Sequence, residues 1–144
     1  MKKTGFLFDK RYMLHETSDY HPEIPERLNA IYKGINEADL LPKLTLINGS
    51  RADLKWIETV HDKDYISSLQ DACVAGKKIF CHPDNQMCSE TFETALLAVG
   101  GILAAIDLVM KNEIDNAFCA VRPPGHHAEP VQQKDKGREI QSPR

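Results

Sequence analysis

The sequence lacks the features that mark several classes of protein. Its four cysteines, at positions 73, 81, 88 and 119, include no C-x-x-C pair. This argues against a zinc or disulfide framework, and we expect reduced thiols in a cytoplasmic protein. Neither charge is in clear excess, with 18 basic and 21 acidic side chains and a net charge of -3. Without a basic excess, we expect neither nucleic acid nor a membrane surface as a partner.

Long apolar segments are also few. The N-terminus offers only Phe6, Leu7 and Phe8 before Asp9, which is too short for the apolar part of a signal peptide. From residue 95 to residue 110 only one side chain is charged. This run is shorter than the roughly 20 residues that span a bilayer. It therefore predicts a helix buried inside a soluble domain.

What the sequence does contain is an alternation of strand-like and helical segments. Its 144 residues, 42% of them hydrophobic, suit one domain with a sizeable core. Three short apolar runs, Phe6–Phe8, Leu44–Ile47 and Ala117–Val121, are separated by helical patterns. We predict an α/β fold in which these runs are neighbouring strands of a mostly parallel sheet flanked by helices.

The helices are predicted from periodicity and from capping residues. One begins near Pro25, one covers residues 53–60, and one runs from Asp62, as its N-cap, to Gly76. A long helix is predicted over residues 89–112 with Ser89 as its cap, and residues 9–24 are predicted to form a loop. Residues 131–144 are polar and patternless. We therefore expect a domain over residues 1–130 and a disordered tail over 131–144.

The strand at residues 117–121 leads into Arg122-Pro123-Pro124-Gly125-His126-His127. Ligands of open α/β sheets bind beyond the carboxyl ends of the strands, and imidazole is the side chain best suited to proton transfer near neutral pH. Adjacent residues on an extended chain point in opposite directions, so both rings can face one substrate only in a tight turn, which Gly125 allows. Histidines are also routine in surface loops, so the pair by itself leaves both readings open.

Four segments in order resemble the N-terminal part of the histone deacetylase family. They are residues 21–28 (HPEIPERL), 60–66 (VHDKDYI), 89–107, and 116–130 (NAFCAVRPPGHHAEP). The family includes bacterial relatives, such as acetoin-utilisation proteins and acetylpolyamine amidohydrolases, to which the chain is similar. The resemblance implies an arginase/deacetylase-like α/β fold, of which this chain would contain the part that ends after the tandem-histidine loop.

The resemblance also implies a reaction, the zinc-dependent hydrolysis of acetyl-lysine or another acetylated amine. His127 would transfer protons, and His126 would supply electrostatics and a hydrogen bond. Asp84 would bind the substrate backbone at the rim, Gly125 would line the acyl-lysine tunnel, and Arg27 would line an internal channel. A plainer alternative for Arg27 is an exposed pair with a nearby glutamate.

The sequence departs from the family in its metal ligands. The family's Asp-x-His pair, its later aspartate and its oxyanion-binding tyrosine have no counterpart after His127. We therefore expect this chain to bind no zinc specifically and to be inactive alone, because an unactivated water is a poor nucleophile. The alternatives are an acyl-lysine or partner-binding module and a gene-model truncation of a full-length deacetylase. The last strand, uncharged and apolar, would be an exposed sheet edge through which the chain could associate with a partner.

Overall fold

The three predicted strands form one parallel sheet in the computed structural model, which describes residues 2–129. They are β1 (Thr4–Phe8), β2 (Thr45–Ile47) and β5 (Asn116–Ala120), in the order β2-β1-β5. β1 is central, with Phe6 level with Leu46 on one side and with Phe118 on the other. The α/β prediction is confirmed, and the predicted tail at residues 131–144 lies outside the described residues.

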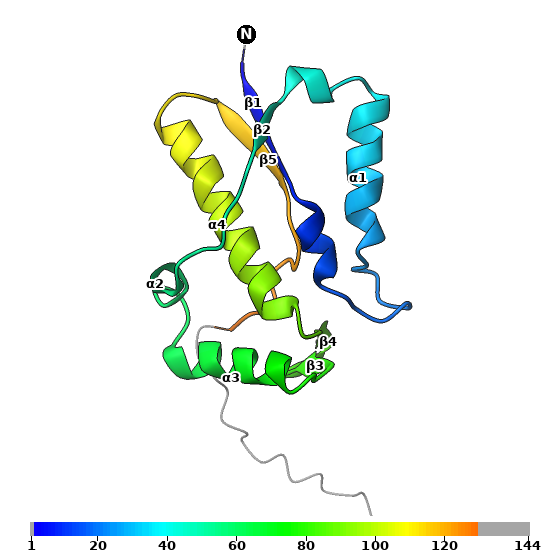
Figure 1. Cartoon of the computed structure of the whole chain (residues 1–144), viewed down its shortest axis with the longest axis vertical. Coiled ribbons are helices and arrows are strands. Elements are labelled where there is room, and N and C mark those ends of the chain that lie inside the picture. Colours follow the sequence, from blue (N-terminus) through cyan, green and yellow to red (C-terminus); the bar gives the residue numbers. More distant parts are fainter. Residues whose placement is uncertain (1, 130–144) are drawn as a thin grey trace, which may run out of the picture.

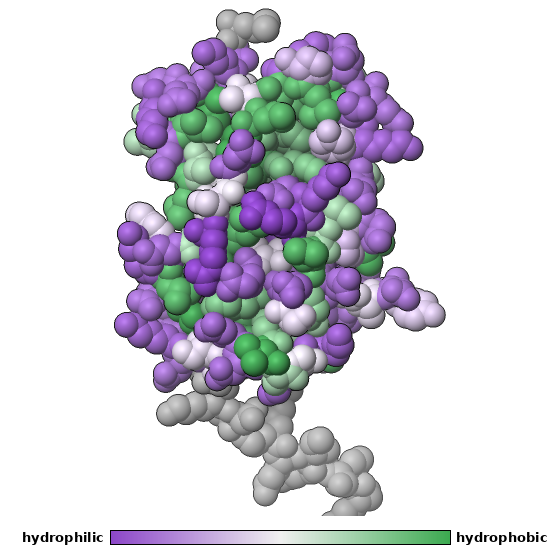
Figure 2. Space-filling model, viewed as in Figure 1, coloured by the Kyte–Doolittle hydropathy of each residue, from purple (hydrophilic) through white to green (hydrophobic). Residues whose placement is uncertain are grey.

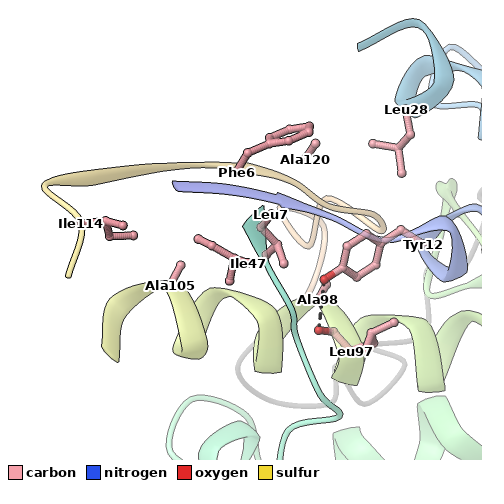
Figure 3. Close-up of a cluster of buried hydrophobic side chains, with 10 residues drawn as sticks. All are labelled: Phe6, Leu7, Tyr12, Leu28, Ile47, Leu97, Ala98, Ala105, Ile114 and Ala120. Carbon is pink, nitrogen blue, oxygen red and sulfur yellow. Dashed lines mark hydrogen bonds between the residues drawn. The ribbon is translucent and has the colours of Figure 1, made fainter. Parts of the chain in front are cut away.

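A helix covers each face of this sheet (Figure 1). α1 (Glu26–Glu37) packs on one face and α4 (Thr91–Met110) on the other. Successive residues of β1 point to opposite faces, so Phe6 lies on the side of Leu28 from α1, whereas Leu7 and Ile47 lie on the side of Ala105 from α4 (Figure 3). The central strand is apolar at consecutive positions because both of its faces are covered.

The helix that precedes the Gly76 turn begins where its capping residue predicts. Asp62 accepts a hydrogen bond from the Tyr65 backbone N–H at 2.6 Å, α3 spans Lys63–Val74, and Gly76 follows it with φ +66°. Asp53 similarly caps α2, which is shorter than predicted, at Leu54–Ile57. The predicted Ser89 cap is wrong. α4 begins later, with Glu90 at the N-cap position, and the Thr91 hydroxyl accepts the Cys88 N–H at 2.8 Å.

α4 is a core helix for a reason other than its length. With 20 residues it is long and apolar enough to cross a membrane, which corrects the argument from run length. However, 44% of its most apolar 18-residue window is buried inside the structure. One end of α4 packs on the sheet and the other packs on α3 in a second cluster with Tyr65, Phe80 and Met87. Burial against two layers therefore accounts for its composition.

Four short elements are not predicted from the sequence. The expected loop over residues 9–24 begins with a 3-10 helix, Lys10–Leu14, capped by Asp9, and its Tyr12 is completely buried. A short antiparallel hairpin, β3 (Ile79–Phe80) and β4 (His82–Gln86), precedes α4. β4 is polar and contains a proline, so it has none of the apolar alternation that marks a strand. A further 3-10 turn, Leu41–Lys43, leads into β2.

Both outer strands of the sheet expose apolar side chains. Leu46 on β2 is 64% exposed and Phe118 on β5 is 49% exposed. On α4, Ile106 and Met110 are also exposed. Figure 2 shows hydrophobic surface in the region of the strands, bordered by hydrophilic residues. Among residues 2–129, β5 pairs only with β1, so its other edge is open, as the sequence predicted.

Candidate active site

A cavity of about 720 Å³ lies beyond the carboxyl end of β5. Its walls come from five parts of the chain: the segment that leads into the first turn of α1, the β4 strand, the first half of α3, the start of α4, and the loop after β5. All five residues carried over from the resemblance line it: Arg27, Asp84, Gly125, His126 and His127. The fold therefore brings together residues that are up to 100 positions apart in sequence (127 − 27).

The two histidines occupy the central positions of a turn. The Ala128 N–H donates to the Gly125 carbonyl at 2.9 Å, and Gly125 has φ +82°, which a residue without a Cβ adopts at no steric penalty. The ring centroids of His126 and His127 are 4.1 Å apart. The tandem pair thus faces one cavity, as the Pro-Pro-Gly sequence before it predicts. Among residues 2–129, neither ring has a hydrogen-bond partner.

Asp84 lies on β4 and lines the same cavity as the histidine turn. Its side chain is 68% exposed, and its carboxylate lies 3.6 Å from Nδ1 of His82. The His82 ring in turn stacks on His127 with centroids 6.5 Å apart. Gln86 accepts a hydrogen bond from the Ser18 N–H at 2.7 Å, which ties the hairpin to the segment before α1. The Asp84 carboxylate is therefore an exposed acidic group in the lining of the cavity.

The wall before α1 contains a buried histidine. His15 is 3% exposed, and its Nδ1 shares a hydrogen bond with the Thr91 hydroxyl at 2.8 Å. Burial, and then the nearby Arg122 guanidinium, lowers the pKa of His15 to about 4. The ring is therefore neutral at pH 7 and belongs to the packing of this wall.

The sequence analysis missed the most buried charged residue of the site. Arg122 is 2% exposed and donates to both carboxylate oxygens of Glu23, from Nε at 2.5 Å and from Nη2 at 2.7 Å. Its Nη1 also donates to the His15 carbonyl at 2.7 Å. A charged residue directly after an uncharged, apolar strand is a signal that could have predicted such a pair.

Arg27 makes the predicted exposed pair with a nearby glutamate, and its role in an internal channel stays a prediction. It lines the cavity, and its Nη1 lies 3.7 Å from Oε1 of Glu23 one helical turn earlier. Its side chain is 59% exposed, so this second ion pair on Glu23 is far weaker than the buried pair with Arg122.

The cavity does not contain a metal site within the described residues. Among residues 2–129, no three histidine, cysteine, aspartate or glutamate side chains lie close enough to hold a metal ion. A catalytic zinc needs three protein ligands and an open position. These residues by themselves therefore do not fit the zinc that the resemblance implies.

Comparison with known proteins identifies the family. The pattern of the Histone deacetylase domain matches residues 21–137, which include the whole loop after β5. The chain belongs to the histone deacetylase family. A probable deacetylase from Archaeoglobus fulgidus is 35% identical over 129 residues, covering 88% of this chain and 35% of that protein. Histone deacetylase 5 from Arabidopsis thaliana is 30% identical over 139 residues, covering 89% and 21%.

A solved structure shows the same fold. The crystal structure of the HDA15 HD domain matches with a TM-score of 0.82 at 25% identity, covering 93% of this chain and 39% of that one. The described residues are thus a partial arginase/deacetylase-like fold, as predicted. This chain of the histone deacetylase family spans about a third or less of the first two curated relatives that it matches.

Proposed function

We propose that the cavity binds the acyl group of an acetylated lysine or of an acetylated small amine, as the substrate site of a deacetylase. The observation that carries this proposal is the Gly125–Ala128 turn, which presents two adjacent imidazoles to a cavity shared with Asp84 and Arg27. A turn of this kind is needed because tandem side chains otherwise diverge. Its position beyond a parallel strand is where α/β folds bind ligands.

Each residue has a role that its environment supports. His127 transfers a proton between the attacking water and the leaving amine, because imidazole can exist in either state near neutral pH. His126, with its ring 4.1 Å from that of His127, supplies a hydrogen bond and electrostatic stabilisation. The exposed carboxylate of Asp84 accepts backbone N–H groups of the substrate. Gly125 lines the path of the acyl chain, and Arg27 lines the channel behind it.

The proposal separates binding from hydrolysis. The family's chemistry depends on zinc, and residues 2–129 do not supply a ligand set for it. We infer that this part of the molecule binds substrate and handles protons, and that hydrolysis needs metal ligands from elsewhere. The 144-residue chain alone is then inactive and acts as an acyl-amine binding module. None of its four cysteines, all of which lie within the described residues, forms a disulfide, so we also propose a reducing compartment such as the cytoplasm.

The test is a binding titration combined with a turnover assay. A peptide that carries one acetyl-lysine is titrated into the ¹⁵N-labelled chain, and the same peptide without the acetyl group is the control. We expect amide shifts at Gly125 and His126 with the acetylated peptide only, and a weaker response in Asp84→Asn. A matched control is Asp64→Asn, an acidic residue outside the cavity. Equal shifts with both peptides, or none, would refute acyl binding.

Turnover is measured as acetate release at saturating zinc, comparing the wild type with His127→Ala. We expect no release from either protein. Clear turnover that disappears in His127→Ala would support the role of His127 but would contradict the inferred inactivity. It would show that the chain completes a metal site with residues that the argument above leaves out.

A further inference from the structure

The tandem-histidine loop is held at its first residue by a buried ion pair. The Arg122 guanidinium uses all three of its nitrogens: Nε and Nη2 bind the Glu23 carboxylate, and Nη1 binds the His15 carbonyl. Glu23 and His15 belong to the segment before α1, 99 and 107 positions away in sequence. Because this segment forms the facing wall of the cavity, Arg122 ties the loop to that wall. Only a planar fork with several donors can make these contacts together.

The same loop is held at its other end by α3. The Glu129 backbone N–H donates to the Tyr65 hydroxyl at 3.2 Å. The Glu129 carbonyl lies 2.5 Å from Nδ1 of His61, which therefore carries a proton and donates it. The rings of His61 and Tyr65 stack, with centroids 5.3 Å apart. The two side chains that bind the Glu129 backbone are therefore packed together near the start of α3.

Between Arg122 and Glu129, the side chains of His126 and His127 make few contacts that would fix their orientation. In the described part of the chain, the rings of His126 and His127 contact each other and, from His127, the ring of His82. No hydrogen bond to residues 2–129 fixes either ring. The turn is also the most exposed part of the loop, with residues 124–128 all exposed. The direction of the two imidazoles thus depends on where the loop ends are held.

We propose that Arg122 and Tyr65 are positioning residues that hold the tandem-histidine turn against the cavity from its two ends. This inference rests on the proposed function only in assigning a catalytic purpose to the turn. The contacts that hold the loop are present whatever the turn does. Arg122 acts through Glu23, and Tyr65 acts through the Glu129 amide. Neither is a catalytic residue. Loss of the Arg122 or the Tyr65 contact loosens one end of the turn and lets the two rings reorient; the His61 contact with the Glu129 carbonyl remains when the Tyr65 hydroxyl is removed.

The experiment measures the conformation and the stability of the turn in the full 144-residue chain. The side-chain ¹⁵N–¹H signals of His126 and His127 are recorded by NMR, and backbone amide exchange is measured for residues 125–129 and for α4. The variants are Arg122→Gln, Arg122→Lys and Tyr65→Phe. The matched control is Arg51→Gln, which breaks a forked ion pair with Glu93 of similar geometry (2.6 and 3.1 Å) but about half exposed and away from the cavity.

In Arg122→Gln and in Tyr65→Phe we expect the two histidine signals to converge and the amides of residues 125–129 to exchange at least about ten-fold faster, with α4 unchanged. Arg122→Lys restores the charge but not the fork, so its exchange lies between the wild type and Arg122→Gln. Arg51→Gln leaves the loop unchanged. Histidine signals and loop exchange that stay as in the wild type in both variants would overturn the proposal. So would an equal rise in α4, since that indicates general destabilisation.

Tyr65→Phe keeps the proposal testable if Arg122→Gln fails to fold. It removes one hydroxyl and preserves the ring, which packs edge-on against Phe80 at 5.5 Å. The readout also distinguishes the two proposals. A wild type that binds no acetyl-lysine peptide, but whose histidine signals move in Tyr65→Phe, refutes the proposed function and retains the anchors. If the wild type binds the acetyl-lysine peptide but the histidine signals do not move in Tyr65→Phe, the proposed function is supported and the anchoring role is refuted.

Discussion

Replacing Gly100 of α4 by alanine should destabilise the protein, although alanine is the better helix former. A Cβ at Gly100 would lie 1.7 Å from the Ser50 carbonyl oxygen and 2.8 Å from the Ala52 nitrogen. Both are backbone atoms of the connection between β2 and α2. That connection is fixed to the same helix, because the Ala52 N–H donates to the Leu96 carbonyl at 3.0 Å. Neither side can yield by rotating a side chain.

The magnitude follows from two opposing effects. A carbon and a carbonyl oxygen approach to about 3.3 Å at closest, so the connection and the helix must separate by roughly 1.5 Å. Overpacking of this kind costs about 1–3 kcal/mol, and a backbone contact belongs at the upper end. The gain in helix propensity from glycine to alanine is about 1 kcal/mol. We expect a net loss of about 2 kcal/mol in the free energy of unfolding.

The matched control is Gly34→Ala on α1, where a Cβ would meet nothing within 4 Å. Here only the propensity counts, and we expect a gain of about 0.5–1 kcal/mol. Urea unfolding followed by far-UV circular dichroism measures both variants against the wild type. A Gly100→Ala protein that is as stable as Gly34→Ala would show that helix and connection are not packed as described, and would refute the reasoning.

Three further predictions concern pH, association and capping. Because His15 has a pKa lowered to about 4 in the folded state and about 6.5 when unfolded, the unfolded chain binds more protons between these values. Stability should therefore fall as pH drops from about 6.5 to 4, and a His15→Gln variant with an unchanged slope would contradict this. The open edge of β5 should give concentration-dependent self-association in sedimentation velocity, reduced by Phe118→Lys, since charge on an edge strand opposes pairing; equal association of both proteins would argue for another interface. Asp62→Ala should lower stability by about 1 kcal/mol in urea unfolding, because the Tyr65 N–H loses its cap; a loss no larger than in Asp64→Ala would show that the cap is not stabilising.

Local patterns in the sequence were sufficient for the regular elements. The sheet strands are apolar at consecutive positions, and the starts of α2 and α3 follow Asp53 and Asp62. Each of these signals is carried by residues within one or two turns of each other, so the sequence contains it directly. β4 was not predicted because its side chains are polar and its pairing with β3 leaves no apolar alternation in the sequence.

The family and the histidine turn were also accessible from the sequence. The run from Arg122 to His127 is contiguous, and the turn needs only a glycine with positive φ and the hydrogen bond that closes it. The pattern match over residues 21–137 confirms the resemblance. The roles of the individual site residues stay predictions, which the titrations above test.

Only the tertiary structure decided which distant residues meet. The sequence offered a nearby glutamate as the partner of Arg27, and Glu23 does lie 3.7 Å from it. It gave no sign that Glu23 also binds Arg122, 99 positions away. The fold buries the Arg122 guanidinium against this carboxylate, whereas Arg27 approaches it from an exposed position. The same holds for Gly100. This position must lack a side chain because the fold places the Ser50 carbonyl against it. Sequence periodicity therefore determines the secondary structure of each segment, whereas tertiary folding determines which other segments it packs against.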